Sequence, residues 1–266
     1  MINLIFKYEN LDINYEVFDG RENKEDANIK PLLILHGWMA KIEAMAPIYL
    51  YFKKQRPVYV LDFPGQAGKS SALENAWGVP EYSYMVKSFI ESQKIVGCDV
   101  IGHSFGGRVI IFLSSKYKDL FNKIILTDAA GVKPKWNAKR TFKILSYKFL
   151  KNTMKIFMPK DKYEKKLDEM RKKRGSTDYA SLSNDIMRQT FNSVINLDLT
   201  DNLKDIDNST LLVWGENDQD TPLYMAKIME KNITDSGLVI IENAGHYSYL
   251  DNTTKYLTVV ECFLNS

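Results

Sequence analysis

The chain opens with two segments in which apolar and polar residues alternate, and it continues with short runs that are apolar throughout. The alternating segments cover residues 3–8 and 12–18 and precede Asp19-Gly20, a pattern that predicts an antiparallel pair of strands. Six apolar runs follow, at residues 31–35, 57–61, 99–101, 124–126, 210–214 and 238–241. Strands that are buried on both faces of a sheet have this continuous pattern.

Helical patterns separate several of these runs, at roughly residues 41–54, 81–96, 105–117, 221–231 and 252–264. Alternation of strands and helices predicts an α/β fold with a mainly parallel central sheet and helices on both faces. Ligands of such sheets bind beyond the carboxyl ends of the strands. The polar residues expected at those ends are His36, Asp62, Ser104, Asp128, Asp218 and His246.

Residues 132–205 break the alternation and have a mostly helical pattern. They contain 18 Lys and Arg but only 9 Asp and Glu, a net charge of +9, whereas the whole chain carries +3. This contrast predicts a basic helical subdomain inserted into a core made of residues 1–131 and 206–266. We interpret the basic charge first as a solvated face, then as an attraction for acidic substrates or an anionic membrane surface. Nucleic acid is not an expected partner, because no recognition motif accompanies the charge.

Composition narrows the class of protein further. Of the 266 residues, 45% are hydrophobic and 12% aromatic, which is enough for a packed core and excludes a disordered chain. With two cysteines and three histidines, neither a disulfide scaffold nor a zinc cluster is expected, and no metal or organic cofactor is implied. We find neither a signal-peptide pattern nor an apolar stretch of about 18 residues, so a cytoplasmic protein is expected.

The segment at 102–106 has the pattern Gly-x-Ser-x-Gly, with Ser104 in its centre. An apolar strand pattern precedes it and a helical pattern follows it, which is the context of a nucleophile elbow. The serine of such an elbow sits in a strained, sharp turn, so its close neighbours must be glycines. Ser104 is therefore the candidate nucleophile.

A serine nucleophile needs a base, and the base needs an acceptor that orients it. His36 directly precedes a glycine at a strand end, and His103 is the chain neighbour of Ser104, so His246 is left by elimination. Asp218, which follows the strand at 210–214, is the preferred acceptor. Asp220 and Asp128 remain alternatives. If they do not orient the base, we expect their carboxylates to accept hydrogen bonds at a helix cap or in a turn.

The chain order of serine, aspartate and histidine is that of the α/β-hydrolase fold. The matching segments are His36-Gly37-Trp38, residues 62–65, residues 102–107, residues 214–218 and Ala244-Gly245-His246. On these segments the chain resembles α/β-hydrolase-fold proteins over nearly its whole length. The resemblance implies a serine hydrolase in which the inserted subdomain is a cap, and in which the backbone N–H groups of Trp38 and Phe105 bind the oxyanion.

The resemblance also suggests a substrate class, a small-molecule carboxylic ester or related acyl compound that forms an acyl-enzyme. The alternatives are a carbon–carbon bond hydrolase of the dienoate type and a ligand-binding or signalling protein on the same fold. Carbon–carbon hydrolases often carry Trp after the catalytic histidine, where this chain has Tyr247. Candidate substrate-binding residues are Trp38, Phe142, Phe149, Met187, Arg188 and Tyr247.

Overall fold

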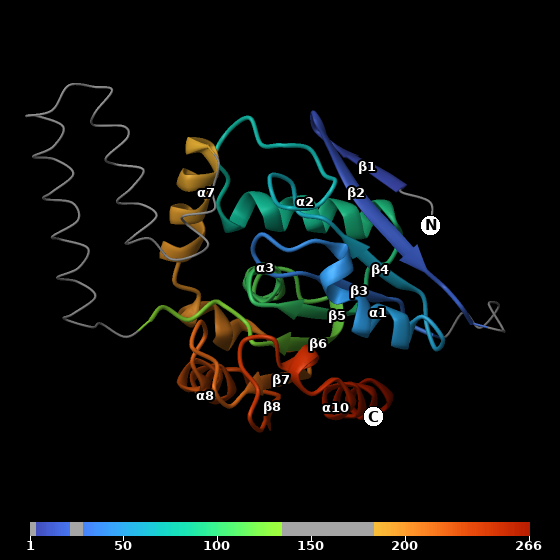
Figure 1. Ribbon diagram of the computed structural model, residues 1–266, viewed down its shortest axis with the longest axis vertical. Coiled ribbons are helices and arrows are strands. Elements are labelled where there is room, and N and C mark those ends of the chain that lie inside the picture. Colours follow the sequence, from blue (N-terminus) through green and yellow to red (C-terminus); the bar gives the residue numbers. More distant parts are fainter. Residues whose placement is uncertain (1–3, 22–28, 135–183) are drawn as a thin grey trace, which may run out of the picture.

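In a computed structural model, which describes residues 4–21, 29–134 and 184–266, eight strands form one twisted sheet (Figure 1). The spatial order of the strands is β1-β2-β4-β3-β5-β6-β7-β8. The strands are β1 (Leu4–Tyr8), β2 (Leu11–Phe18), β3 (Leu32–Leu35), β4 (Val58–Leu61), β5 (Cys98–His103), β6 (Phe121–Thr127), β7 (Thr210–Gly215) and β8 (Ser236–Ile241). Every strand that the hydrophobic pattern predicts is present.

The directions of the strands divide the sheet into a short antiparallel edge and a long parallel part. β1 pairs with β2, and β2 pairs with β4, in antiparallel registers. All pairs from β4 through β3, β5, β6 and β7 to β8 are parallel. The carboxyl ends of the parallel strands therefore meet at one edge, and the mainly parallel α/β fold expected from the sequence is confirmed.

Helices cover both faces of the sheet because the buried strands are apolar on both sides. Leu33 and Leu35 of β3 pack in one cluster with α2 (Val79–Ser92), α3 (Phe105–Ser114) and α8 (Leu223–Asn232). Leu32 and Ile34 point the other way, toward α1 (Ala46–Phe52) and α10 (Thr253–Asn265). This alternation along a single strand holds the two helical layers on one sheet.

One predicted helix is divided in the structure, and another follows a short helix that the pattern did not predict. The pattern at 41–54 forms a 3-10 turn at Ile42–Met45 followed by α1, which has Pro47 in its first turn, where the missing N–H costs nothing. The pattern at 252–264 is preceded by a short helix, α9 (Ser248–Asp251), and the Asn252 side chain caps α10 by accepting a hydrogen bond from Lys255 N at 3.2 Å. The proline in the first turn of α1 and the Asn252 cap of α10 are consistent with where these helices begin.

Of the predicted subdomain at 132–205, residues 135–183 lie outside the described residues. The described remainder holds α7 (Asp185–Asn196) and a 3-10 turn at Thr200–Asp205. Met187, Phe191 and Val194 form the buried stripe of α7, with the i, i+4, i+7 spacing of an amphipathic helix. α7 stands beside α3 at the carboxyl edge of the sheet (Figure 1).

Across the described part of the chain, every helix is too short or too polar to cross a bilayer.

Candidate active site

Ser104 stands in a sharp turn between β5 and α3. Its backbone has φ of 50° and ψ of −108°, a strained conformation for a residue with a side chain. The start of α3 approaches the end of the neighbouring strand β3 so closely that an added Cβ at Gly106 would lie 2.2 Å from the carbonyl oxygen of Leu35. Only glycine fits at position 106, and the turn that it permits presents Ser104 to a pocket.

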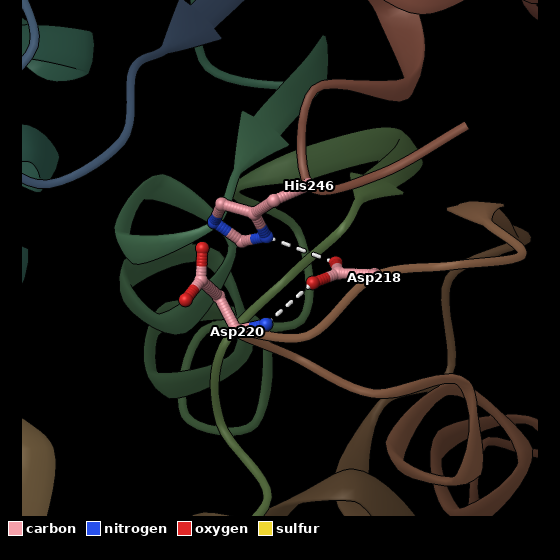
Figure 2. Close-up of side chains that lie close together, drawn as sticks. All are labelled: Asp218, Asp220 and His246. Atoms are coloured by element: carbon pink, nitrogen blue, oxygen red, sulfur yellow. Dashed lines mark hydrogen bonds and ion pairs between the residues drawn. The ribbon is translucent and has the colours of Figure 1, made fainter.

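A chain of hydrogen bonds joins Ser104, His246 and Asp218. The Ser104 Oγ atom lies 3.0 Å from Nε2 of His246. The other ring nitrogen of His246, Nδ1, lies 2.9 Å from Oδ2 of Asp218 (Figure 2). The three side chains come from the turn after β5 and from the loops after β7 and β8, so the carboxyl edge of the sheet brings them together. Such an imidazole can accept the hydroxyl proton while the carboxylate stabilises the imidazolium.

The pKa shifts of His246 and Asp218 have opposite signs, as expected for a buried ion pair. Burial by itself lowers the pKa of His246, but the hydrogen bond and charge of Asp218 outweigh burial and raise it above 6.5. Burial by itself raises the pKa of Asp218, but the hydrogen bonds from His246 and Thr221 give a net lowering. Asp218 is therefore ionised at neutral pH, and it strengthens His246 as a base.

The carboxylate of Asp218 is oriented by donors of its own loop. Its Oδ1 atom accepts hydrogen bonds from the N–H groups of Asp220 at 2.8 Å and Thr221 at 2.9 Å, and Thr221 Oγ1 donates to Oδ2 at 2.7 Å. The Asp220 carboxylate is exposed and lies on the other side of the imidazole (Figure 2). Only Asp218, of these two candidates, makes a hydrogen bond to His246 within the part of the chain that the structure describes.

Asp218, Asp220 and His246 also present ligand atoms within 4.8 Å of one another, a spacing that could suit a metal ion. Two of these atoms, Nδ1 of His246 and Oδ2 of Asp218, are already hydrogen-bonded to each other. His246 and Asp218 therefore have the geometry of a proton-transfer pair.

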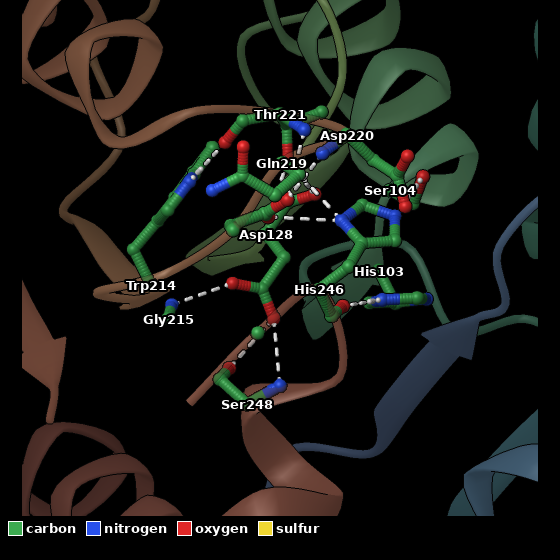
Figure 3. Close-up of polar contacts among 12 residues, drawn as sticks. His103, Ser104, Asp128, Trp214, Gly215, Gln219, Asp220, Thr221, His246 and Ser248 are labelled. Carbon is green, nitrogen blue, oxygen red and sulfur yellow. Dashed lines mark hydrogen bonds and ion pairs between the residues drawn. The ribbon is translucent and has the colours of Figure 1, made fainter. Parts of the chain in front are cut away.

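Asp128, the third aspartate considered from the sequence, ties together the loops that carry Asp218 and His246 (Figure 3). Its Oδ1 atom accepts a hydrogen bond from Gly215 N at 2.8 Å, and its Oδ2 atom accepts from Ser248 N at 3.0 Å and Ser248 Oγ at 2.6 Å. Burial raises the pKa of Asp128 to about 7, against the opposing effect of these hydrogen bonds. Asp128 thus supports the site instead of contacting His246.

Replacing Asp128 by alanine is expected to lower the free energy of unfolding by about 3 kcal/mol, because it leaves the buried N–H groups of Gly215 and Ser248 without an acceptor. Urea denaturation at pH 7 measures the loss. Asp207→Ala is the control, since Asp207 is 67% exposed in an ion pair with Lys118, and its loss should cost less than about 1 kcal/mol. Equal losses in the two variants would contradict this role.

His103 is a supporting residue that the sequence analysis set aside. Its ring is buried and its Nε2 atom lies 2.8 Å from the backbone oxygen of His246 (Figure 3). Burial, together with the nearby charge of His246, lowers the pKa of His103 to about 3, so the neutral ring donates its Nε2 proton to that carbonyl. His103 therefore holds the backbone of His246, the proposed base, in place. The position of His103 next to Ser104 in the sequence did not indicate this contact.

Trp38 and Phe105 lie beside Ser104 at one wall of the pocket. Phe105 is the first residue of α3, so its N–H has no acceptor within the helix. The rings of Trp38 and Phe105 meet edge to face with centroids 5.4 Å apart, and Phe191 of α7 lies 5.4 Å from Trp38 on another side. The two backbone segments named for the oxyanion therefore adjoin the nucleophile.

The pocket at Ser104 has a volume of about 360 Å³. The described residues that line it are Gly37, Trp38, Ala40, His103, Ser104, Phe105, Arg108, Ala130, Val132, Pro134, Phe191, Val194, Ile195, Gln219, Asp220, Thr221, Met225, His246 and Tyr247. Its wall away from the His246 side is mostly apolar. Its size is at the low end of the range of about 300–1,000 Å³ for small-molecule sites.

The candidate substrate-binding residues fall into three groups. Trp38 and Tyr247 line the pocket. Met187 lines a second cavity of about 190 Å³ beside Gly65, and Nη1 of Arg188 bonds Asp185 at 2.7 Å; the described lining of the pocket at Ser104 includes neither residue. Phe142 and Phe149 lie outside the described residues. α7 instead turns Phe191, Val194 and Ile195 toward Ser104, a direction that depends on how the helix docks.

Comparison with known proteins identifies the family of the chain. The model of the alpha/beta hydrolase fold family matches residues 30–253. Monoacylglycerol lipase ABHD6 of Rattus norvegicus is 23% identical over 255 residues, which cover 88% of this chain and 75% of the relative. A 2-hydroxy-6-oxononadienedioate/2-hydroxy-6-oxononatrienedioate hydrolase of Pseudomonas putida is 22% identical over 279 residues, covering 96% of this chain and 93% of the relative.

A solved structure has the same architecture. The esterase of Exiguobacterium antarcticum is 20% identical, superposes with a TM-score of 0.76, and covers 100% of both chains. At that identity the likeness shows the fold alone, whereas the family model spans most of this chain. The protein therefore belongs to the α/β-hydrolase fold family and is a hydrolase of that family.

Proposed function

We propose that the protein is a serine hydrolase of small carboxylic esters in which Ser104 is the nucleophile, His246 the base and Asp218 the acid that orients it. The observation that carries this proposal is the hydrogen-bonded chain with distances of 3.0 Å and 2.9 Å. The low pKa of Asp218 and the raised pKa of His246 support these roles. So does the strained backbone of Ser104.

The proposed reaction runs in two halves. His246 takes the Ser104 proton as Oγ attacks the carbonyl carbon, and the N–H groups of Trp38 and Phe105 bind the negative oxygen that develops. The alcohol leaves with the proton from His246, which leaves an acyl group on Ser104. Water then gives its proton to His246 and attacks the acyl group, which regenerates the serine. Asp218 stabilises the imidazolium in both halves.

We further propose that residues 132–205 form the cap over this pocket, on the core of residues 1–131 and 206–266. Phe191, Val194 and Ile195 of α7 support the assignment because they line the pocket that also contains Ser104. A cap over the site excludes water and shapes the acyl pocket. Contact of the basic cap with an anionic membrane surface is part of the same proposal, and vesicle co-sedimentation at low salt tests it.

A second candidate function is hydrolysis of a carbon–carbon bond in a dienoate-type compound. The full-length relationship to the Pseudomonas putida dienedioate hydrolase favours it. The same serine, histidine and aspartate would act on both substrate classes, so the two functions are separated only by offering both kinds of substrate. A ligand-binding protein on this fold would instead react about once per molecule.

Turnover of p-nitrophenyl esters with acyl chains of graded length tests the ester proposal. We expect many turnovers per molecule and a preference for short acyl chains, because the pocket of about 360 Å³ is small. Labelling by a fluorophosphonate probe reports an activated serine independently of substrate choice. A folded protein that neither turns over esters nor takes the label would contradict the assignment of Ser104.

A further inference from the structure

Arg108 is a charged residue in the lining of the pocket, one helical turn from the nucleophile. It lies on α3, where its backbone N–H donates to the Ser104 carbonyl at 3.3 Å. The residue is only 6% exposed, yet it lines the same pocket as Ser104 and His246. A guanidinium group carries five N–H donors and is rarely buried without partners for them.

The protein supplies few of the partners that this guanidinium needs. Among the described residues, its hydrogen bonding is limited to one bond, from Nη1 to the carbonyl oxygen of Leu197 at 2.5 Å. Leu197 follows the end of α7, where the helix dipole is negative. Within the described ranges, Asp198 is the carboxylate whose charge acts on Arg108, and it does so at a distance, without an ion pair or a hydrogen bond.

Arg108 nevertheless carries its charge. Burial lowers its pKa to about 10, which still leaves the guanidinium protonated at neutral pH, and the charge of Asp198 raises the pKa. A buried cation without a counter-ion destabilises the folded state unless something compensates it. The nearby pocket wall of Ala130, Val132 and Val194 offers only apolar side chains. Among the described residues no counter-charge contacts Arg108, and the pocket that it lines has room for an anionic group of a ligand.

We propose that Arg108 binds a carboxylate on the acyl part of the substrate, so that the substrates of this site are small esters whose acyl group carries a free acid. The inference rests on the proposed function of Ser104, since it names the substrate class of the same site. Guanidinium binds carboxylate with parallel hydrogen bonds that are stronger than those between neutral groups. Arg108 is thus the specificity-determining residue, and the carboxylate supplies a counter-charge that no described residue places within ion-pair distance.

The test compares two esters that differ only in the terminal group. Monoethyl glutarate ends in a carboxylate where ethyl valerate ends in a methyl group, and the acid released from each is followed by titration. The wild-type protein should show a higher kcat/KM for monoethyl glutarate. In Arg108→Met the ratio of the two kcat/KM values should fall by about 10- to 100-fold, largely through KM for the anionic ester. Arg108→Lys should restore part of the ratio.

Lys133→Met is the matched control. Lys133 is exposed and does not line the pocket, although both of its neighbours do, so this variant removes a nearby positive charge without touching the proposed contact. Its ratio of kcat/KM values should equal that of the wild type. An equal fall in Lys133→Met and Arg108→Met would overturn the proposal in favour of general electrostatic attraction. Equal losses of kcat/KM for both esters in Arg108→Met would also overturn the proposal, because Arg108 would then only hold the end of α7 through its hydrogen bond to Leu197.

A binding measurement separates this inference from the proposed catalytic function. Calorimetry with glutarate and the Ser104→Ala protein does not depend on turnover. Binding in Ser104→Ala that is lost in the double variant with Arg108→Met would support the anion site even if neither ester is hydrolysed. Absence of binding in both proteins, or equal binding in both, would overturn the anion site while leaving fluorophosphonate labelling of Ser104 to decide the hydrolase proposal.

Discussion

Replacing Ser104 by alanine is expected to lower kcat for a p-nitrophenyl ester by about 10⁴- to 10⁶-fold, the largest effect of any single substitution in this protein. The Oγ atom, 3.0 Å from Nε2 of His246, is the atom that forms the acyl-enzyme in the proposed reaction. The backbone donors at Trp38 and Phe105 remain in the variant, so a residual rate above that of water is expected. Steady-state kinetics and fluorophosphonate labelling both measure the loss.

Ser115→Ala is the matched control for this variant. Ser115 ends the same helix, α3, is half-buried, and donates its hydroxyl to the carbonyl of Phe112 at 3.0 Å, away from the pocket. Its substitution should change kcat by less than about twofold. If Ser104→Ala retained most of the activity while folding normally, the hydrolysis would have to use another nucleophile, and the assignment of Ser104 would be wrong.

The second large effect is expected for Asp218→Asn, which should lower kcat by about 10⁴-fold. An amide in place of the carboxylate no longer stabilises the imidazolium, and it favours the wrong tautomer of His246. The pH dependence should change as well. In the wild type, kcat/KM should rise as His246 loses its proton, with a midpoint above 6.5, because the hydrogen bond and charge of Asp218 outweigh burial. In Asp218→Asn the midpoint should move down, since burial is then opposed only by the weaker effects of the Asp128 and Asp220 charges.

Asp220→Asn decides between the two aspartates of this loop. Asp220 is exposed and its effect on His246 is only that of a nearby charge, so its loss should lower kcat far less than that of Asp218 and shift the midpoint only slightly. Rate profiles between pH 5 and 9 compare the three proteins. A larger loss in Asp220→Asn than in Asp218→Asn would move the orienting role to Asp220.

Gly106 and His103 show what the sequence pattern could predict about the site and what it could not. The spacing within 102–106 predicted a turn that needs glycine, and the close approach of Gly106 to Leu35 explains why. The same spacing said nothing about His103, whose ring reaches across to the backbone of His246. A periodic pattern reports which residues are buried, but not which distant loop a buried polar side chain contacts.

For substrate-binding residues in the proposed cap, residues 132–205, the sequence pattern likewise predicts burial but not contacts. The sequence predicted mostly helical structure for residues 132–205, and the described part of this segment holds α7, which has a buried apolar stripe. Which part of it faces Ser104 depends on the docking of α7 against Trp38 and α3, so Phe191 lines the pocket while Met187 lies at a second cavity. The sequence did not indicate a role for Arg108 for a similar reason, because the residues that follow it in α3 form a continuous apolar run.

The sequence by itself determined the strand and helix order, the mainly parallel sheet, and the family, because these depend on local periodicity and on short motifs with fixed spacing. It also singled out Ser104 and His246, and preferred Asp218, from chain order and position after strands. Only the tertiary structure decided the hydrogen-bond partners: Asp218 at the imidazole, Asp128 between two loops, and Arg108 inside the pocket. Those contacts join residues far apart in the chain, and their distances follow from how the loops pack at the sheet edge.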